Sequence, residues 1–119
     1  MTPPSPIVAS LPRDVIQRNG ERTPFDAVRI QSAIARAGQA TGEFGEDEAR
    51  LLTAQATKVL IHRFHGEAPT IEQIQDVVEQ TLIAANHLQT ARAYMAYRQR
   101  HATLRADRQT LVHVESSIN

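Results

Sequence analysis

Residues 15–30 read Val-Ile-Gln-Arg-Asn-Gly-Glu-Arg-Thr-Pro-Phe-Asp-Ala-Val-Arg-Ile and lead from two short extended segments into a charged helix start. Asn19-Gly20 between extended residues predicts a type I′ hairpin turn, because both positions tolerate positive φ and the turn matches the twist of the strands. Residues 15–18 and 21–25 are then expected to pair as a ribbon.

A helix is predicted directly after this ribbon. Pro24 has no N–H to give to a strand ladder, so it belongs at an edge or at a strand end. Asp26 can then cap a helix that begins at Ala27, because its carboxylate accepts from the free amides of the first turn. This arrangement brings three cationic side chains close together, Arg18, Arg22 and Arg29.

Apolar and small residues that recur every three or four positions predict four helices, over residues 27–37, 46–64, 71–85 and 88–106. Gly38 or Gly42 can end the first helix and Gly66 the second. Thr70-Ile71-Glu72-Gln73 has the pattern of a capping box and opens the third. A two-stranded ribbon is marginal alone in water, so it should lie across the helices, and residues 67–69 can join it as a third strand.

Composition indicates one domain of 119 residues that can bury its own core. Thirteen basic and thirteen acidic side chains balance, so no bulk field draws the chain to nucleic acid or to a membrane. Cysteine is absent, which excludes disulfides, thiolate metal sites and a cysteine nucleophile. No apolar run approaches the roughly 20 residues that span a bilayer, and the start lacks the pattern of a signal peptide. We expect a cytoplasmic protein.

The residues offer little for catalysis or for a metal. His62 and His65, with Glu67 nearby, have the spacing of part of a zinc site, but no third and fourth ligand follow at a suitable distance. A phosphate-binding loop ending in Gly-Lys is absent, since the single lysine is Lys58 in the middle of a predicted helix. We predict no catalytic residues and no metal ligands.

Three segments in order resemble the ATP-cone, the regulatory nucleotide-binding module at the start of many ribonucleotide reductases and of their transcriptional repressor. The first lies within residues 15–37, the second is residues 69–79, and the third is residues 93–100. The resemblance covers about residues 15–106 and implies a mainly α fold (α+β), a four-helix bundle capped by a small three-stranded β-sheet. Residues 1–14, with four prolines, are expected to be a flexible leader. Residues 107–119 resemble the link into the catalytic domain of the anaerobic reductase class.

The resemblance also implies a ligand and partners. ATP or dATP, with Mg²⁺, would bind as an allosteric ligand between the sheet and the helix ends and control the overall activity of a ribonucleotide reductase. In this family ATP permits turnover and dATP stops it, commonly by changing subunit association. The expected partners are a reductase catalytic domain, in cis or in trans, and further copies of the chain in a nucleotide-dependent homo-oligomer; membrane and nucleic acid are not expected.

Arginine forks bind phosphate oxygens in a bidentate way, which makes Arg18, Arg29, Arg98 and Arg100 the candidates for a triphosphate. Val15 and Phe25 suit the walls of an adenine pocket, and Asp26, Thr23 and the turn from Ile71 to Gln75 suit hydroxyl or base contacts. The family most often has lysine where this chain has Gln17, so a weaker phosphate contact is expected there. The full set of predicted nucleotide-binding residues is Val15, Gln17, Arg18, Asn19, Thr23, Phe25, Asp26, Arg29, Ile71, Gln75, Arg98 and Arg100.

Simpler interpretations stand beside these. Arg18 can pair with Glu21 across the ribbon, Val15 and Phe25 can be core residues, and Asp26 can be only a helix cap. Two other functions remain open: a helical adaptor that binds a protein through the arginine-rich face of the last helix, and a repressor-type regulator. The missing cysteines count against the second, because they leave no zinc ribbon.

Overall fold

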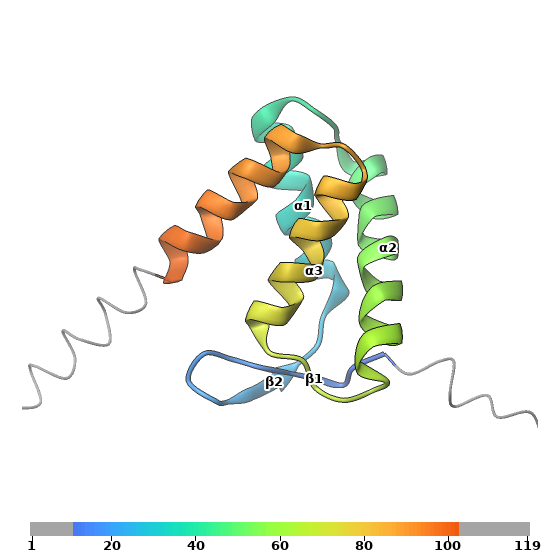
Figure 1. Ribbon diagram of the computed structural model, residues 1–119, viewed down its shortest axis with the longest axis vertical. Coiled ribbons are helices and arrows are strands. Elements are labelled where there is room, and N and C mark those ends of the chain that lie inside the picture. Colours follow the sequence, from blue (N-terminus) through green and yellow to red (C-terminus); the bar gives the residue numbers. More distant parts are fainter. Residues whose placement is uncertain (1–10, 103–119) are drawn as a thin grey trace, which may run out of the picture.

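The computed structural model describes residues 11–102, which form four helices and a two-stranded antiparallel sheet (Figure 1). The strands are β1 (Asp14–Ile16) and β2 (Arg22–Pro24), and the first three helices are α1 (Ala27–Thr41), α2 (Glu46–Phe64) and α3 (Ile71–Ala84). The C-terminal helix comprises residues 88–102 of the described chain. Residues 1–10 of the predicted leader and the predicted link at 107–119 lie outside the described residues. The predicted mainly helical fold is confirmed.

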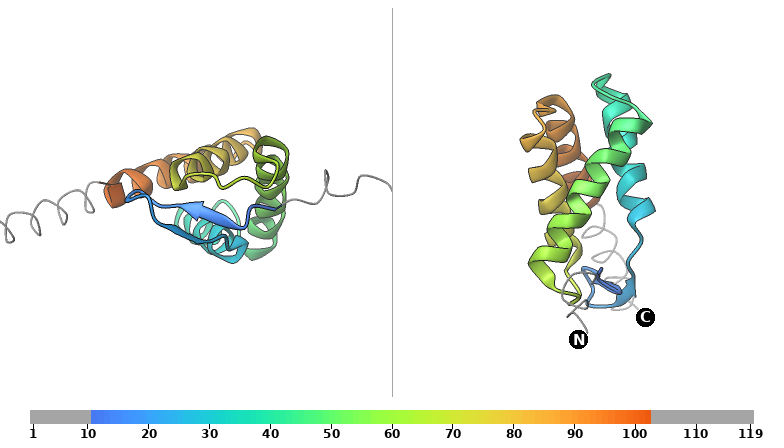
Figure 2. Two further views of the ribbon diagram at one scale, coloured as in Figure 1. Left: turned by 90° about the horizontal axis from the view of Figure 1, so that it is seen from below. Right: turned by 90° about the vertical axis from the view of Figure 1, so that its right-hand side faces the viewer.

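The core lies between the helices. α2 packs against both α1 and α3, and the C-terminal helix adds Ala91 and Tyr94 to the same buried cluster. Ile34, Leu60 and Leu82 are fully buried in it. Seen from below, the ribbon lies across the end of the molecule, between α1 and α3 (Figure 2). Both of these helices begin at that end (Figure 1), so their first turns and the ribbon share one region.

Local capping signals place the helix starts as predicted. The Asp26 carboxylate accepts from the Val28 amide at 3.0 Å, and α1 begins at Ala27. Thr70 Oγ1 accepts from the Gln73 amide, while the Gln73 side chain accepts from the Thr70 amide, which completes the capping box. α1 runs past Gly38 and ends at Gly42, whose φ of 76° is the left-handed cap conformation.

The end of α2 differs slightly from the prediction. The left-handed cap position is His65, with a φ of 50°, and Gly66 follows with a φ of 87°. A left-handed non-glycine residue is uncommon and histidine is one of the types that tolerate it. No helix among residues 11–102 is long and apolar enough to cross a membrane.

The predicted type I′ turn is wrong. Within residues 11–102 the positive φ angles outside glycine belong to His65 and Asn86, so Asn19 has negative φ and only Gly20, at 87°, is left-handed in this turn. Gln17 N donates to Glu21 O at 2.8 Å and Gly20 N to Gln17 O at 2.9 Å, which makes a three-residue loop over 18–20. Such a loop needs one left-handed residue, and the Asn19 side chain secures it by accepting from the Glu21 amide at 3.0 Å.

The predicted third strand is reduced to one contact. Ile16 forms a single parallel bridge with Thr70, and Ile16 N donates to Pro69 O at 2.9 Å. Pro69 lacks an N–H and Thr70 already caps α3, so residues 67–69 do not extend the ladder in the described chain. The ribbon is therefore attached to the start of α3 at one point.

A hydrogen-bonded clamp fixes the start of the C-terminal helix at the opposite end of the molecule. The Glu43 carboxylate, in the loop between α1 and α2, accepts from the Thr90 amide at 2.8 Å and from Thr90 Oγ1 at 2.5 Å. Thr90 is fully buried and its hydroxyl also meets Thr41 Oγ1 at 2.8 Å. We call Thr41, Glu43 and Thr90 the capping clamp. The hydrogen bond from the Thr90 side chain is the main reason that the pKa of Glu43 lies below its usual value.

The capping clamp should make stability depend on pH. A carboxylate whose pKa is lower in the folded state stabilises the fold above its unfolded pKa, and that contribution is lost as the pH falls through the folded pKa. Urea unfolding between pH 7 and pH 3 should therefore show a smaller acid-induced loss of stability for Glu43→Gln than for the wild type. Glu67→Gln, at an exposed carboxylate without an ion pair among residues 11–102, is the matched control and should follow the wild type.

Candidate functional site

The ribbon loop, α1, α3 and the C-terminal helix line a half-open cavity of about 190 Å³. We call it the arginine cavity because two arginines, Arg18 from the loop and Arg29 from the first turn of α1, line it. Its apolar wall comes from α1 and α3, and its remaining polar groups come from α3 and the C-terminal helix. The lining residues are Arg18, Arg29, Ile30, Ala33, Ile71, Ile74, Gln75, Val78, Tyr94, Tyr97 and His101.

Charge in the arginine cavity has one sign. The residues that line it within the described chain include two guanidinium groups and no carboxylate. Arg29 is exposed and makes no ion pair among residues 11–102, so its donors face solvent. α1 and α3 both begin near this cavity, and the positive ends of their dipoles add to the field. The arrangement suits an anion joined to an apolar, planar group.

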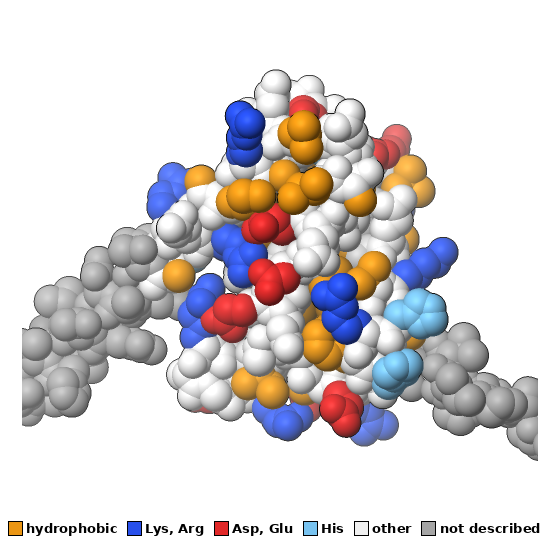
Figure 3. Space-filling view, viewed as in Figure 1, with side chains coloured by type: hydrophobic (Ala, Val, Ile, Leu, Met, Phe, Trp, Pro, Cys, Tyr) orange, Lys and Arg blue, Asp and Glu red, His pale blue; other side chains and the backbone are white. Residues whose placement is uncertain are grey.

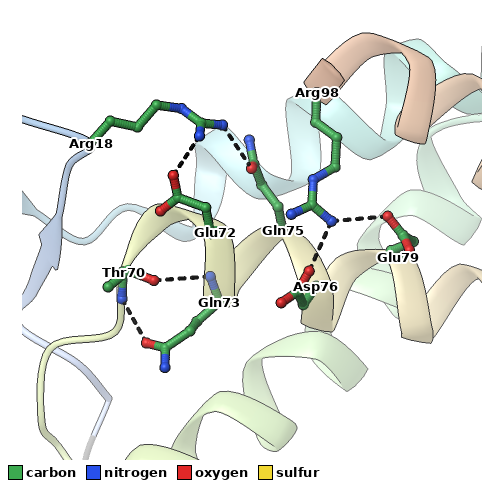
Figure 4. A network of polar contacts seen from close by, with 8 residues as sticks. All are labelled: Arg18, Thr70, Glu72, Gln73, Gln75, Asp76, Glu79 and Arg98. Atoms are coloured by element: carbon green, nitrogen blue, oxygen red, sulfur yellow. Dashed lines mark hydrogen bonds and ion pairs between the residues drawn. The ribbon is translucent and has the colours of Figure 1, made fainter. Parts of the chain in front are cut away.

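Arg18 pairs with α3 and not with the ribbon. Its Nη1 forms an ion pair with Glu72, and its Nη2 approaches Gln75 Oε1 at 3.4 Å (Figure 4). The alternative pairing with Glu21 is wrong, because the three-residue loop sets Gln17 opposite Glu21 and leaves Arg18 within the loop. The turn geometry therefore sends Arg18 toward α3 and the arginine cavity.

Arg98 is engaged on the outer side of α3. Its Nη1 donates to Asp76 Oδ1 and to Glu79 Oε1, both at 2.9 Å. Burial opposes the charge, but the hydrogen bonds to these two carboxylates outweigh it and raise the pKa of Arg98. Arg98 and Arg18 both line a second, more open cavity of about 300 Å³. Figure 3 shows acidic and basic side chains interleaved on the face formed by α3 and the C-terminal helix.

Arg100 lies in a different cavity. It lines a space of about 220 Å³ together with Arg36, four alanines and the rings of Tyr94 and Tyr97, between α1 and the C-terminal helix. The four predicted phosphate-binding arginines are thus divided: Arg18 and Arg29 share one cavity, Arg98 joins Arg18 in a second, and Arg100 lines a third that adjoins the first at Ala33, Tyr94 and Tyr97.

The other predicted residues of the ribbon have structural contacts. Val15 is buried in the core, and Phe25 is half-buried and packs against it. Gln17 Nε2 donates to Thr23 Oγ1 at 2.8 Å across the ribbon. Asn19 secures the turn and Asp26 caps α1, as described above. Ile71 and Gln75 do line the arginine cavity.

Sequence reasoning did not include seven of the eleven lining residues in the site, and two of these seven, Tyr97 and His101, carry rings that can contact a ligand. Their rings lie 4.2 Å apart between centroids, and Tyr97 is 39% exposed. The predicted nucleotide-binding residues include neither of them. The spacing i, i+4 on a helix was the available signal, because it places two side chains on one face.

Comparison with known proteins decides the family. A family model described as "ATP cone domain" matches residues 13–103. The chain belongs to the ATP-cone family. The match covers the ribbon, the arginine cavity and all four helices, so the resemblance noted in the sequence is confirmed.

Ribonucleotide reductases are among the relatives of this ATP-cone. The "Vitamin B12-dependent ribonucleoside-diphosphate reductase" of Mycobacterium tuberculosis (strain CDC 1551 / Oshkosh) is 40% identical over 96 residues, which are 81% of this chain and 13% of that protein. The "Ribonucleoside-diphosphate reductase subunit alpha" of Chlamydia muridarum is 33% identical over 103 residues, 79% of this chain and 10% of that protein. The "Anaerobic ribonucleoside-triphosphate reductase" of Haemophilus influenzae is 36% identical over 84 residues, which are 71% of this chain and 12% of that protein.

The alignments show which part of these reductases resembles this chain. The ATP-cone spans about 10 to 13% of the length of each reductase, so the shared part is a small regulatory domain and not the catalytic body. The anaerobic reductases to which the sequence pointed are among the relatives, beside two other kinds.

Proposed function

We propose that this ATP-cone binds ATP and dATP in the arginine cavity and so controls the activity of a cytoplasmic ribonucleotide reductase, as part of the same chain or as a separate subunit. The observation that carries the proposal is the pairing of Arg18 and Arg29 around a cavity without carboxylates in its described lining. Membership of the ATP-cone family supports the choice of ligand.

The arginine cavity has a charged region and an apolar region, which suit the phosphates and the purine of a nucleotide. Phosphate oxygens would meet the guanidinium forks of Arg18 and Arg29, since such charge-assisted hydrogen bonds are about twice as strong as neutral ones. The purine would lie against the ring pair of Tyr97 and His101 and the apolar side chains of α1 and α3. At about 190 Å³ the space is small for a whole triphosphate, and the cavity that shares Arg18 offers room beside it.

Arg98 and Arg100 take outer positions in this proposal. Arg98 lies in the adjoining cavity, where it can act on phosphate groups that extend past Arg18. Arg100 adds positive charge from the next turn of the C-terminal helix. Val15, Phe25, Thr23 and Asp26 hold the ribbon and the start of α1 in the shape that presents Arg18 and Arg29.

Mg²⁺ fits as a companion of the triphosphate. No cluster of three or more His, Asp or Glu suited to a metal occurs among residues 11–102, so the cation would be held by phosphate oxygens and water. It would neutralise part of the phosphate charge, and the arginines would meet the remainder.

Regulation requires more than binding. ATP and dATP must favour different conformations or assemblies, and such coupling between sites is typically about 1 to 3 kcal/mol. The reductase catalytic domain, and further copies of the chain in a nucleotide-dependent homo-oligomer, are the partners on which this difference would act.

Calorimetric titration with Mg²⁺-ATP and Mg²⁺-dATP tests the proposal. We expect saturable binding of both nucleotides at micromolar concentrations, and much weaker binding of CTP, whose smaller ring covers less of the aromatic pair. An absent or millimolar affinity for every nucleotide would instead support the helical adaptor. Turnover of the reductase, measured with each nucleotide, tests the regulatory part.

Gln17→Lys should strengthen nucleotide binding. A lysine in the ribbon adds a cation beside the loop that carries Arg18, and charge-assisted contacts to phosphate exceed neutral ones. We expect the dissociation constants of ATP and dATP, measured by calorimetry, to fall by roughly 3- to 10-fold. Gln55→Lys, at an exposed position of α2, makes the same change away from the cavity and should leave both constants unchanged. An equal effect of the two substitutions would contradict the prediction.

A further inference from the structure

α3 presents an acidic face to the two arginines that border the nucleotide cavities. Glu72, Asp76 and Glu79 follow one another at helical spacing and so project from one side of the helix. Figure 4 shows this face reaching Arg18 from the ribbon loop and Arg98 from the C-terminal helix. Two elements that are distant in sequence are thus attached to α3 by ion pairs.

The two arginines are held unequally. Arg98 meets two carboxylates at 2.9 Å and its side chain is 19% exposed. Arg18, whose side chain is 25% exposed, meets only one carboxylate in the described chain, Glu72, and has a long contact with Gln75. Exposed single ion pairs contribute little to stability, whereas a shared and partly buried arrangement is stronger. Arg18 is therefore the arginine that can exchange its partner.

The attachment of the ribbon also favours exchange at Arg18. The ribbon meets the start of α3 through the single bridge of Ile16 with Thr70, and Arg18 lies at the loop beyond that point. Beyond that bridge, Arg18 ties the tip of the loop to α3 through the ion pair with Glu72 and the long contact with Gln75.

We propose that Glu72 competes with nucleotide phosphate for Arg18, so that binding of ATP or dATP exchanges the carboxylate for phosphate and releases the ribbon loop from α3. This inference rests on the proposed nucleotide binding and adds how the bound state is transmitted. A phosphate at Arg18 repels the neighbouring Glu72 carboxylate, because like charges at close range disfavour each other. The wild-type affinity then includes the work of breaking the Arg18–Glu72 pair.

Glu72→Gln is the decisive variant. Glutamine keeps the size of the side chain and removes its charge, so ATP should bind roughly 2- to 5-fold more tightly than to the wild type, the range expected for one exposed ion pair. Asp47→Asn removes an equal charge from an exposed ion pair with Arg50 on α2 and is the matched control. Its affinity should equal that of the wild type. Thermal unfolding of each variant, without nucleotide, verifies that the fold is kept.

A second measurement follows the loop itself. Backbone amide resonances of residues 18–20 in nucleotide-free Glu72→Gln should shift from the wild-type positions toward those of the ATP-bound wild type. Equal ATP affinities of Glu72→Gln and Asp47→Asn, or loop resonances that stay at the free wild-type positions, would overturn this inference and leave the nucleotide site standing. A wild-type chain that binds no nucleotide would overturn the proposed function and the inference together.

Discussion

Substitution of Arg18 and Arg29 together by glutamine should weaken ATP binding by about 100-fold or more, because each lost charge-assisted contact costs about 1.5 to 3 kcal/mol. These are the two cations that line the arginine cavity, and Glu72, which pairs with Arg18, lies outside the described lining. Glutamine remains polar but lacks the charge, the reach and the bidentate fork of arginine, so the loss measures the whole guanidinium contact. Calorimetry with Mg²⁺-ATP, under the conditions used for the wild type, measures it.

The matched control removes the same two charges from α2. Arg50→Gln with Arg63→Gln changes exposed residues of a helix that lines none of the three cavities described above. This variant should bind ATP within about twofold of the wild type, since screened charges far from a site contribute little. If the Arg18 and Arg29 double variant also stays within that range, the nucleotide binds elsewhere.

Leu82→Ala should destabilise the fold strongly, with a loss of about 2 to 5 kcal/mol in the free energy of unfolding. Leu82 is fully buried in α3, on the side that packs into the core, and alanine would leave a void among the helices. Denaturant unfolding followed by circular dichroism measures the loss. The adjacent Ile83→Ala, at a side chain that is 45% exposed, should change stability by less than about 0.5 kcal/mol. Similar losses for both would mean that α3 is not packed as described.

Signals that act over a few residues were sufficient to predict the helices. Asp26 and Thr70 fix helix starts through bonds to amides two or three residues away, and Gly42 ends α1 by adopting positive φ. Each interaction lies within its own segment, so the sequence carries it directly. The family resemblance depended on the same short segments.

Contacts between segments that are distant in the sequence could not be predicted from such local signals. A type I′ turn requires Asn19 to adopt positive φ, whereas in the observed loop its side chain accepts a hydrogen bond from the Glu21 amide. That choice set the partner of Arg18, which is Glu72, 54 positions away. The hydrogen bond between Glu43 and Thr90 joins residues 47 positions apart, and no local sequence pattern around either residue predicts it. The division of the arginines among three cavities likewise follows from helix packing.

The capping clamp holds the start of the C-terminal helix, and Arg98 ties the same helix to α3 two turns later through Asp76 and Glu79. From Thr90 to residue 102 the helix extends by about 18 Å, so a tilt of roughly 10° at Glu43 would displace the far end by about 3 Å. Tyr97 and His101, which line the arginine cavity, lie well along that arm. A ligand that displaces these rings would tilt the helix against the ion pairs of Arg98, and within the described chain the displacement would be largest at residue 102.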